Sequence, residues 1–251
     1  MPQYRRVLVK FSGGALRPSD TSDGLVDPAA LNRVARQLAS LHALGAQVAV
    51  VMGGGNIFRG RDAEAFRIER AEADQIGMLA TVINAMFLRG ALIAQGHDAV
   101  RVMTAQPMTA VAEPYIRLRA ETHLERGRIV ILAGGTGQPY QTTDYPSVQR
   151  AGELKCEAVL VAKDGASGVY EEDPRENPDS RVYQVLNATD LIRQELLVMD
   201  PTAVMLARDL HLPIHVVGAA EPDNLVAVFR GEDVGTLIHW ELPSRFWADA
   251  V

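Results

Sequence analysis

The chain has 251 residues, of which 47% are apolar and 22% are charged, and this balance is typical of globular proteins. It excludes disordered, collagen-like and coiled-coil chains. The 31 acidic residues outnumber the 25 basic ones, so the formal net charge is −6, which argues against a protein that coats nucleic acid.

Apolar strand patterns alternate with amphipathic helix patterns along the whole chain. A buried strand is predicted over 4–11. Asp27 followed by Pro28 predicts the N-cap and first turn of a helix that ends near Gly45. The unbroken apolar segment 46–52 is typical of a central strand in a parallel sheet. Further strands are predicted over 98–103, 128–132, 157–162, 213–218 and 234–239, and further helices over 71–95, 117–126, 144–154, 188–195, 201–211 and 222–230.

This alternation predicts one wound α/β domain with helices on both faces of a mostly parallel sheet. We find no linker rich in proline, glycine or serine that would divide the chain, and 173–178 is predicted to be a surface loop. Four glycine-rich loops follow predicted strands, over 11–16, 53–60, 134–144 and 163–170. Because ligands of such sheets bind beyond the carboxyl ends of the strands, we expect these loops to form one site.

The chemistry of these loops indicates a site for a large polyanion or for two anions that face each other. Glycine lets backbone N–H groups approach an anion closely. Only three of the basic residues are lysines, and Lys10 and Lys163 each end a strand and precede a glycine-rich turn. Lys155 is predicted to be solvated, and Arg59 adds a cation to the second loop. Chance remains an alternative explanation for the placement of the lysines.

The usual nucleotide and hydrolase motifs are absent. The sequence contains neither G-x-x-x-x-G-K-[ST] nor G-x-G-x-x-G, and no G-x-S-x-G elbow. A phosphoryl-transfer site built from backbone amides, two lysines and an arginine remains, because that reaction depends on positioning and charge neutralisation.

Cysteine content and apolar segments indicate a cytoplasmic protein. Cys156 is the single cysteine, so no intrachain disulfide forms, and the histidines and cysteine show no zinc-ligand spacing. The first residues do not resemble a signal peptide. We also expect no apolar segment long enough to span a bilayer.

Six segments in order resemble the uridylate (UMP) kinases of bacteria, a family within the amino acid kinase superfamily. They are KFSGGAL, GGGNIFRG, ADQIGMLATVINAMFL, GGTGQPYQTTD, AKDGASGVYEEDP and VMDPTAVMLARD, and the resemblance extends from Tyr4 to Ile238. It implies a three-layer αβα sandwich formed by a single domain, 1–251, with an acceptor half over 4–155, an ATP half over 156–238 and a tail over 239–251.

The resemblance also implies an activity and its partners. It implies transfer of the γ-phosphoryl group of ATP to UMP, which gives UDP for pyrimidine nucleotide biosynthesis. It further implies Mg2+ bound with ATP, and a homohexamer regulated by GTP and UTP.

Carried over residue by residue, the resemblance assigns a donor site. Lys10 would neutralise the transferring phosphoryl group, and Arg59 would hold phosphate oxygens. Tyr170 and Asp173 would contact the adenosine, although core packing is an alternative for Tyr170. The implied ATP contacts are Lys10, Phe11, Ser12, Gly13, Gly55, Arg59, Asp164, Tyr170 and Asp173.

The acceptor site follows from the same resemblance. Asp74 would bind the ribose of UMP, although a helical aspartate can also be a surface residue or a cap. Gly54 and Gly55 would lie between the two sets of phosphates. The implied UMP contacts are Gly54, Asp74, Thr136, Gly137, Gln138, Pro139, Tyr140, Gln141, Thr142 and Thr143.

Two aspartates complete the implied catalytic set of Lys10, Lys163, Arg59, Asp144 and Asp200. The pair would orient the lysines and help to place Mg2+, and no metal site made of protein ligands alone is predicted. A simple helix cap is the alternative for Asp144.

Four positions depart from the family pattern, and they leave other functions open. Gly14 replaces a glutamate, Gln138 an asparagine, Gln141 a phenylalanine and Ser167 an aspartate. The alternatives are a superfamily enzyme with a shifted phosphate acceptor, and a non-catalytic cage or sensor for a nucleotide or oxoanion.

Two segments are candidates for contacts with another subunit. The tail 239–251, which we place beyond the usual end of the family, holds both tryptophans of the chain, and it either frays or packs against a neighbouring subunit. The helix 71–95 is a candidate interface because its apolar residues cover more than one stripe: Met78, Leu79, Val82, Met86, Phe87 and Leu88.

Overall fold

The computed structural model describes residues 3–17, 24–60, 63–196 and 198–247, and within these ranges ten strands form one central sheet. Most of the long strands are apolar segments buried on both faces. The strands are β1 (Arg6–Phe11), β2 (Gln47–Met52), β3 (Val100–Thr104), β4 (Glu113–Pro114), β5 (Ile129–Ala133), β6 (Ala158–Lys163), β7 (Tyr183–Asn187), β8 (Ile214–Gly218), β9 (Thr236–His239) and β10 (Arg245–Phe246).

The sheet is mostly parallel, as predicted. Its order is β10-β7-β9-β8-β6-β1-β2-β5-β3-β4. All neighbours run parallel except β8 with β9 and β7 with β10. The strands β6, β1, β2 and β5 are therefore adjacent, and their carboxyl ends lie along one edge of the sheet.

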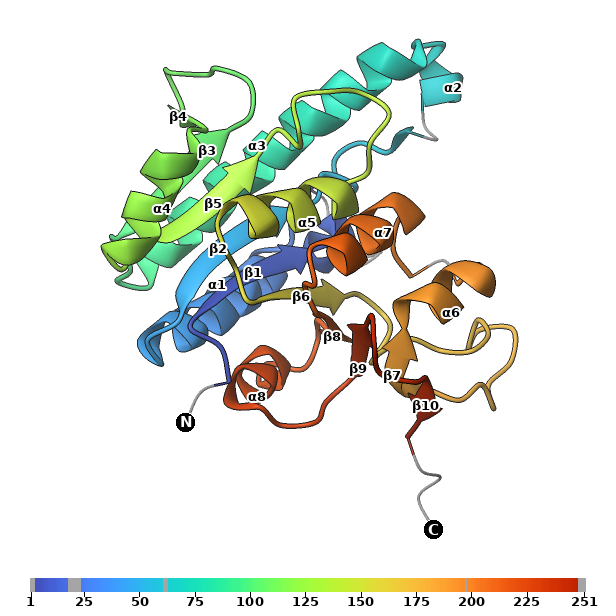
Figure 1. The fold of residues 1–251 in the computed structure, drawn as a ribbon. Helices are drawn as coiled ribbons and strands as arrows, with labels where there is room; N and C mark the ends of the chain where they lie inside the picture. The colour runs from blue at the N-terminus through green and yellow to red at the C-terminus, as the bar shows by residue number, and fades with distance from the viewer. Residues whose placement is uncertain (1–2, 18–23, 61–62, 197, 248–251) are drawn as a thin grey trace.

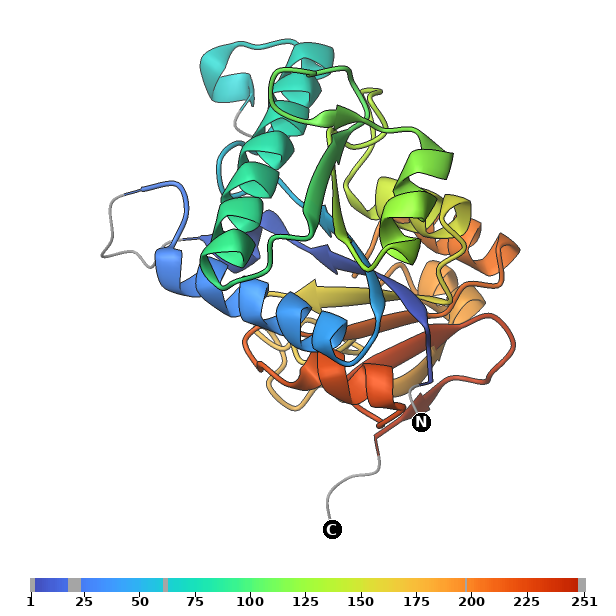
Figure 2. The same cartoon turned by 90° about the vertical axis from the view of Figure 1, so that its left-hand side faces the viewer.

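Helices cover both faces of the sheet, which gives the three-layer αβα sandwich (Figures 1 and 2). One face packs against α1, α3 and α8, and the other against α4, α5, α6 and α7. The helices are α1 (Pro28–Ala43), α2 (Ala63–Phe66), α3 (Arg70–Ala94), α4 (Arg117–Glu125), α5 (Asp144–Glu153), α6 (Ala188–Arg193), α7 (Pro201–Asp209) and α8 (Asn224–Arg230), with a 3-10 turn η1 (Gly13–Leu16) after β1.

The alternation of side chains along β1 decides where its lysine points. Val7, Val9 and Phe11 are buried in the core that α1, α3 and α8 cover, and Leu8 is buried in the other core. Because side chains two residues apart share a face of the sheet, Lys10 points with Leu8 toward the layer that contains α5.

The predicted helix boundaries agree with the structure to within about two residues, and the first cap is confirmed. Asp27 accepts hydrogen bonds from Ala29 N at 2.6 Å and from Ala30 N at 3.1 Å. A cap of this kind stabilises a protein by about 0.5–2 kcal/mol. Gly45 follows the helix with a φ of 88°, a left-handed conformation that glycine adopts without strain.

The sequence patterns did not predict β4, β7, β10 or α2. The strands β4 and β10 have two residues each, too few for any periodicity. The strand β7 ends at Asn187, which is itself the N-cap of α6 and accepts a hydrogen bond from Thr189 N at 2.9 Å. Strand and helix therefore follow each other without the turn residues that usually mark a boundary.

The expectation that no segment is long and apolar enough to span a bilayer is wrong for α3. This helix has 25 residues, and its most apolar window has a mean hydropathy of 1.8. Half of that window is buried in the molecule, where α3 packs against α1, β3 and β5. Its apolar composition therefore matches that of a core helix. Outside the core, Leu79, Ile83, Met86 and Phe87 are exposed.

The tail packs against its own chain as far as residue 247. Phe246 pairs with Tyr183 across β10 and β7, and their rings stack with centroids 4.2 Å apart. Trp247 donates from Nε1 to Gly235 O at 2.8 Å, and the Trp240 ring stacks on His239. The alternative that the tail frays is therefore wrong for these residues, whereas contact with a second subunit stays a prediction.

Candidate active site

A buried ion pair lies where the carboxyl end of β1 meets the first turn of α5. Lys10 Nζ is 2.6 Å from Asp144 Oδ1, and the Lys10 side chain is 7% exposed. Asp200 donates its backbone N–H to Asp144 Oδ2 at 3.1 Å. Burial raises the pKa of Asp144, but the Lys10 ammonium and these hydrogen bonds outweigh it and hold the pKa below its ordinary value. Asp144 is thus an ionised partner for the lysine.

Lys163 belongs to the same cluster of charges. Lys10 lies opposite Val161 in the parallel pairing of β1 with β6, and Lys163 is two residues further along β6. The two lysines therefore project from adjacent strands on the same face of the sheet. Burial and the charge of Lys10 lower the pKa of Lys163, and Asp144 opposes this effect. The predicted convergence of two ammonium groups is confirmed.

Asp200 supports this cluster from the start of α7. Its Oδ1 accepts from Thr202 N at 2.9 Å, so Asp200 is the N-cap of α7. Its Oδ2 accepts from the Thr142 hydroxyl at 3.1 Å. The helix-cap alternative for Asp144 is wrong, because the N-cap of α5 is Thr143 and the Asp144 carboxylate contacts Lys10.

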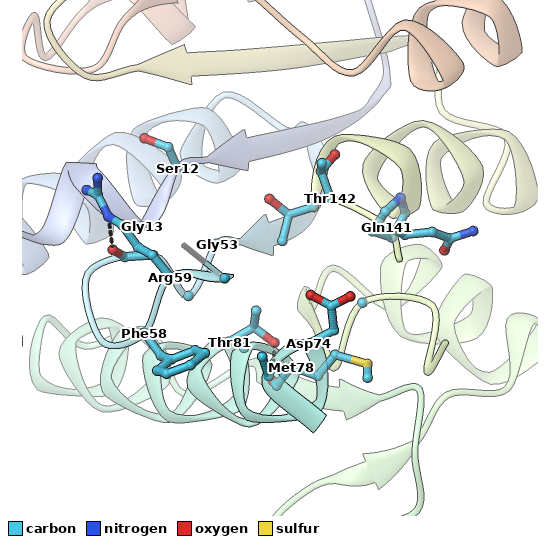
Figure 3. Close-up of a pocket in the computed structure, with 18 of the residues that line it drawn as sticks. Ser12, Gly13, Gly53, Phe58, Arg59, Asp74, Met78, Thr81, Gln141 and Thr142 are labelled. Carbon is cyan, nitrogen blue, oxygen red and sulfur yellow. Dashed lines mark hydrogen bonds between the residues drawn. The ribbon is translucent and has the colours of Figure 1, made fainter. Parts of the chain in front are cut away.

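A cavity of about 550 Å³, the α3 cavity, lies beyond the carboxyl ends of β1 and β2. Figure 3 shows side chains from several elements around it: Ser12 after β1, Arg59 after β2, Asp74 from α3 and Thr142 before α5. Arg59 Nε donates to Gly55 O at 2.7 Å. The predicted site residues that line the cavity are Ser12, Gly13, Gly54, Gly55, Arg59, Asp74, Thr136, Gln138, Gln141, Thr142, Thr143 and Asp164.

One face of α3 forms the floor of this cavity. Asp74, Met78 and Thr81 line it at helical spacings of four and three residues. Asp74 Oδ2 accepts from Tyr140 N at 2.7 Å. The Thr81 hydroxyl donates to Met78 O at 2.7 Å and accepts from Gly134 N at 2.8 Å. These bonds attach the loop 134–144 to α3. Asp74 is therefore neither a cap nor an isolated surface residue.

Two glycines let the first two loops approach each other and α3. A Cβ on Gly13 would collide with the backbone N of Gly55 and lie 2.8 Å from that of Asn56. A Cβ on Gly54 would lie 2.8 Å from Gly77 O of α3. Larger residues would push the loops apart, so their backbone amides stay close together beside the cavity.

A second cavity, the β6 cavity, lies beyond Lys163 and has a volume of about 590 Å³. Of the residues assigned to the donor, Asp164, Tyr170 and Asp173 line it together with Lys163. Ser12, Gly13, Gly55 and Arg59, which the resemblance also assigns to ATP, line the α3 cavity instead. The Tyr170 hydroxyl is 2.9 Å from Ser167 Oγ, and the ring is only partly buried, so core packing does not describe it. Asp164 lines both cavities, which therefore adjoin at the lysine cluster.

Asp173 lies in a local ion pair at the edge of the β6 cavity. Its Oδ2 is 2.5 Å from Arg175 Nη2. The hydrogen bonds from Arg175 lower the pKa of Asp173 to about 2. A nucleotide that used this carboxylate as an acceptor would compete with Arg175.

Some of the expected contacts differ from the structure. The Phe11 side chain is fully buried in the core, so only its backbone reaches the loops, where its carbonyl accepts from Gly53 N at 2.9 Å. Gly137, Pro139 and Tyr140 do not line the α3 cavity, and Tyr140 is 66% exposed. Lys10, an expected ATP contact, and its partner Asp144 line neither cavity.

Several lining residues were not predicted. On the α3 face the spacing of Asp74 already pointed to Met78 and Thr81, so helical periodicity was a usable signal. No comparable signal marked the segment after α6, which forms the far wall of the β6 cavity. The additional residues include Phe58, Gly60, Ala73, Gly77, Met78 and Thr81 in the first cavity, and Glu172, Glu195, Leu196 and Val198 in the second.

Three of the four departures from the family pattern, Gly14, Gln138 and Gln141, line the α3 cavity, whereas Ser167 lines neither cavity and contacts Tyr170. A Cβ on Gly14 would lie 3.3 Å from Asp164 Oδ2. A side chain at position 14 would therefore start close to the carboxylate of Asp164. Gln141 Oε1 accepts from the Thr136 hydroxyl at 2.5 Å. The Thr136 hydroxyl also accepts from Gln138 N at 3.2 Å, so both glutamines take part in the loop's hydrogen bonds.

Comparisons with known proteins agree with this geometry. A sequence model of the amino acid kinase family matches residues 5–218. A uridylate kinase of Frankia casuarinae is 51% identical over 238 residues, which cover 95% of this chain and 91% of that protein. A uridylate kinase of Ruegeria sp. is 44% identical and covers 94% of each chain.

Solved structures give the same relationship. A UMP kinase of Bacillus anthracis superimposes with a TM-score of 0.94 at 49% identity, and the match covers 99% of this chain and 100% of the other. The tail thus falls within this match, and its placement beyond the usual end of the family is wrong for this relative. A UMP kinase of Ureaplasma parvum gives a TM-score of 0.88 at 30% identity, covering 94% and 99%. The chain belongs to the amino acid kinase family and, within it, to the uridylate kinases.

Proposed function

We propose that this chain transfers the γ-phosphoryl group of ATP to UMP and releases ADP and UDP. One observation carries the proposal: two cavities adjoin at Asp164, next to Lys163, and Lys163 belongs to the same cluster as the buried pair of Lys10 and Asp144. Each cavity has the volume of a typical small-molecule site, of roughly 300–1,000 Å³. Two phosphorylated molecules bound there would meet end to end.

In the proposed arrangement UMP occupies the α3 cavity and ATP the β6 cavity. Asp74 accepts from the ribose of UMP. Arg59 and Gly55 line the α3 cavity and not the β6 cavity, so here they hold the phosphate of UMP, whereas the family resemblance assigned them to ATP. Tyr170 and Asp173 contact the adenosine of ATP. This division assigns the acceptor half to residues 4–155 and the donor half to 156–238.

The chemistry needs charge neutralisation more than a base. A phosphate oxygen of UMP is already ionised near neutral pH, so it attacks the γ-phosphorus of ATP in line while the bond to the β-phosphate oxygen breaks. Lys10 and Lys163 neutralise the negative charge on the moving group, and Asp144 fixes the position of Lys10. Removal of one such preorganised group typically costs about 10²–10³ in kcat.

Mg2+ is proposed as a partner of ATP rather than as a resident of the protein. Within the ranges that the structure describes, no three histidine, cysteine, aspartate or glutamate side chains could together hold a metal ion. Asp164 lies where the cavities adjoin. Mg2+ in nucleotide sites typically uses one or two carboxylates with phosphates and water, so Asp164 fits that role. The ion would add Lewis-acid neutralisation of the donor phosphates.

A phosphotransfer assay across several acceptors tests the proposal. Purified protein with ATP and Mg2+ is offered UMP, CMP, dUMP and GMP, and UDP formation is followed by a coupled ADP assay and by chromatography. UMP should give the highest kcat/KM. Absence of UDP would overturn the proposal, and ATP binding without turnover of any acceptor would favour a non-catalytic nucleotide cage.

A shifted acceptor is the second candidate, and it rests on Gln141. This polar side chain lines the α3 cavity and is bonded to Thr136, where the family pattern has a phenylalanine ring. A ring stacks on any base, whereas an amide selects by hydrogen bonds. If UMP ranks among the poorest acceptors in the panel, this candidate replaces the first.

Assembly, effectors and location are further parts of the proposal. The exposed apolar residues Leu79, Ile83, Met86 and Phe87 on α3 support a homo-oligomer, which the family resemblance makes a hexamer regulated by GTP and UTP. The single cysteine, buried and without a disulfide partner, supports a cytoplasmic location. Sedimentation velocity with and without GTP or UTP tests the assembly.

A further inference from the structure

The side chain of Phe246 lies between two residues of the β7 region. Its ring stacks on Tyr183, with centroids 4.2 Å apart and an interplanar angle of 26°. The Arg181 guanidinium carbon lies 3.9 Å from the ring centroid on a cation–π contact. The backbone next to it is also fixed, because Trp247 N donates to Val182 O at 3.0 Å.

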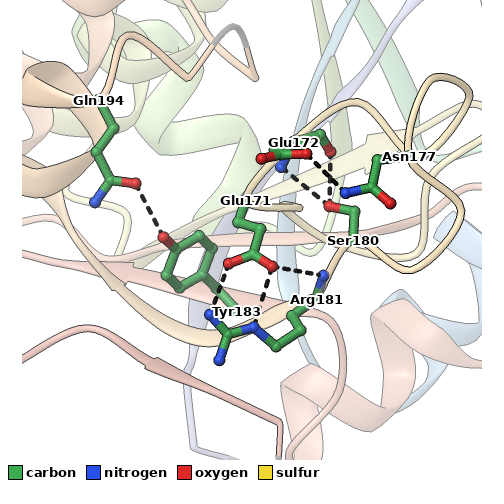
Figure 4. Close-up of polar contacts among 7 residues, drawn as sticks. All are labelled: Glu171, Glu172, Asn177, Ser180, Arg181, Tyr183 and Gln194. Carbon is green, nitrogen blue, oxygen red and sulfur yellow. Dashed lines mark hydrogen bonds and ion pairs between the residues drawn. The ribbon is translucent and has the colours of Figure 1, made fainter.

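Arg181 connects Phe246 to one wall of the β6 cavity. It forms a two-pronged contact with Glu171, through Nη2 to Oε2 at 2.8 Å and Nε to Oε1 at 3.0 Å (Figure 4). The hydrogen bond from Arg181 lowers the pKa of Glu171. Tyr170 and Glu172, the neighbours of Glu171, both line the cavity.

The same wall carries a second set of bonds that hold it in shape. Glu172 N donates to Ser180 Oγ at 3.0 Å, and the Ser180 hydroxyl donates to Glu172 O at 2.9 Å. Asn177 Nδ2 donates to Glu172 Oε2 at 2.7 Å. Figure 4 shows these contacts beside the pair of Glu171 and Arg181. These bonds connect the wall to the segment that carries Arg181 and leads into β7.

Tyr183 connects Phe246 to a second segment of the cavity wall. Its hydroxyl donates to Gln194 Oε1 at 3.0 Å (Figure 4). Glu195 and Leu196, the next two residues, also line the β6 cavity. One ring from the tail thus touches two side chains, each of which is bonded to a different wall of the same cavity.

We propose that Phe246 is a positioning residue of the β6 cavity: its ring, held between Arg181 and Tyr183, sets the spacing of the two walls that bind the donor nucleotide. The ring does not contact the nucleotide itself, and it acts through Glu171 and Gln194. The inference rests on the proposed function only in assigning the donor to this cavity.

The test compares Phe246→Ala with Phe246→Tyr and measures KM for each substrate. Loss of the stacking and cation–π contacts should raise KM for ATP about fivefold, while kcat and KM for UMP stay within about twofold of wild type. Phe246→Tyr keeps the ring and should restore KM for ATP. Equal KM values for ATP in Phe246→Ala and wild type would overturn the inference.

Two further variants separate positioning from general loss of tail structure. Trp240→Ala removes another tail ring, which stacks on His239 instead of the cavity walls, and it should leave KM for ATP unchanged. Arg181→Met removes the ion pair with Glu171 and should raise KM for ATP as much as Phe246→Ala does. It therefore tests the inference if Phe246→Ala folds poorly. A rise in Trp240→Ala as large as in Phe246→Ala would also overturn the inference.

Measuring the affinity for ATP in the absence of an acceptor tests the positioning role independently of the proposed function. In calorimetry with ATP and Mg2+, the dissociation constant for ATP should be about fivefold higher for Phe246→Ala than for wild type, whichever acceptor the enzyme uses. In Trp240→Ala the remaining tryptophan is Trp247, next to Phe246, and ATP but not UMP should change its fluorescence. Absence of UDP with weakened ATP binding would overturn the activity and leave the positioning role in place.

Discussion

Lys10→Met tests the buried ion pair most directly, because it removes the ammonium and keeps most of the apolar stem. The lysine is 7% exposed and its partner Asp144 is 15% exposed, so water cannot replace the lost cation. Asp144 still accepts from Asp200 N at 3.1 Å, but its charge is then buried without its nearest partner.

The expected losses in activity and in stability differ. UDP formation should fall by about 10²–10³ in kcat, because one preorganised charge at the reacting group is gone. The free energy of unfolding at neutral pH should fall by about 3–5 kcal/mol, the usual cost of leaving one member of a buried pair uncompensated. Lys163, which also acts on Asp144, makes the lower end of that range the better expectation.

The double variant Lys10→Met/Asp144→Asn separates the two losses. It removes both charges, and the asparagine still accepts from Asp200 N, so stability should return to within about 1 kcal/mol of wild type. Activity should stay as low as in the single variant. Urea unfolding and initial rates of UDP formation measure the two quantities. If the kcat of the double variant is within tenfold of the wild-type kcat, the assignment of Lys10 to charge neutralisation is refuted.

Four further outcomes follow from the same geometry. In wild type the fold lowers the pKa of Asp144, so the ionised carboxylate stabilises the protein at pH values above its ordinary pKa of 3.8. This stabilisation is lost as the pH falls through the lowered pKa of the folded state. Acid unfolding of Asp144→Asn should therefore lack this pH-dependent loss of stability. Thr81→Val leaves Gly134 N without its acceptor and should cost about 1–3 kcal/mol in urea unfolding, with a raised KM for UMP. Gly54→Ala would place a Cβ 2.8 Å from the α3 backbone and should lower kcat/KM for UMP about 100-fold in the coupled assay. Gly90→Ala, also in α3 but with nothing within 4 Å, should leave kcat/KM unchanged and raise stability by about 0.5–1 kcal/mol, and a loss of activity there would count against this view of Gly54.

Most of the fold was predictable because its central strands are apolar and its first helix has a clear cap. The segment 46–52 was predicted as a central parallel strand, and β2 lies between β1 and β5. Asp27 with Pro28 marked the start of α1. For such elements the local preference and the final fold agree. In contrast, β10 exists only because β7 offers it a pairing edge, and two residues carry no pattern of their own.

The site was predictable where residues follow strands, and less so where walls are assembled from distant segments. Glycine loops and lysines at strand ends pointed to one edge of the sheet, and the structure confirms that Lys10 and Lys163 converge there. Leu196 and Val198 line the β6 cavity only because α6 folds back beside β7. Phe246 carries no sequence signal either, since its role depends on Arg181 and Tyr183, more than sixty residues earlier in the chain.

The scarcity of lysine in this chain has a structural explanation. The exposed lysine, Lys155, is 73% solvent-accessible and pairs with Glu121 at 3.5 Å, a contact that arginine would make equally well. The other two lie on one face of adjacent strands, and Lys10 approaches a buried carboxylate at 2.6 Å. An ammonium is a compact charge, whereas a planar guanidinium is larger and needs several hydrogen-bond partners. The chain otherwise uses arginine but keeps lysine at two positions that share one cluster, which favours a need for compact cations over chance. The physical reason for the cluster is that the parallel pairing of β1 with β6 brings two strand ends side by side, on the face of the sheet that α5 covers.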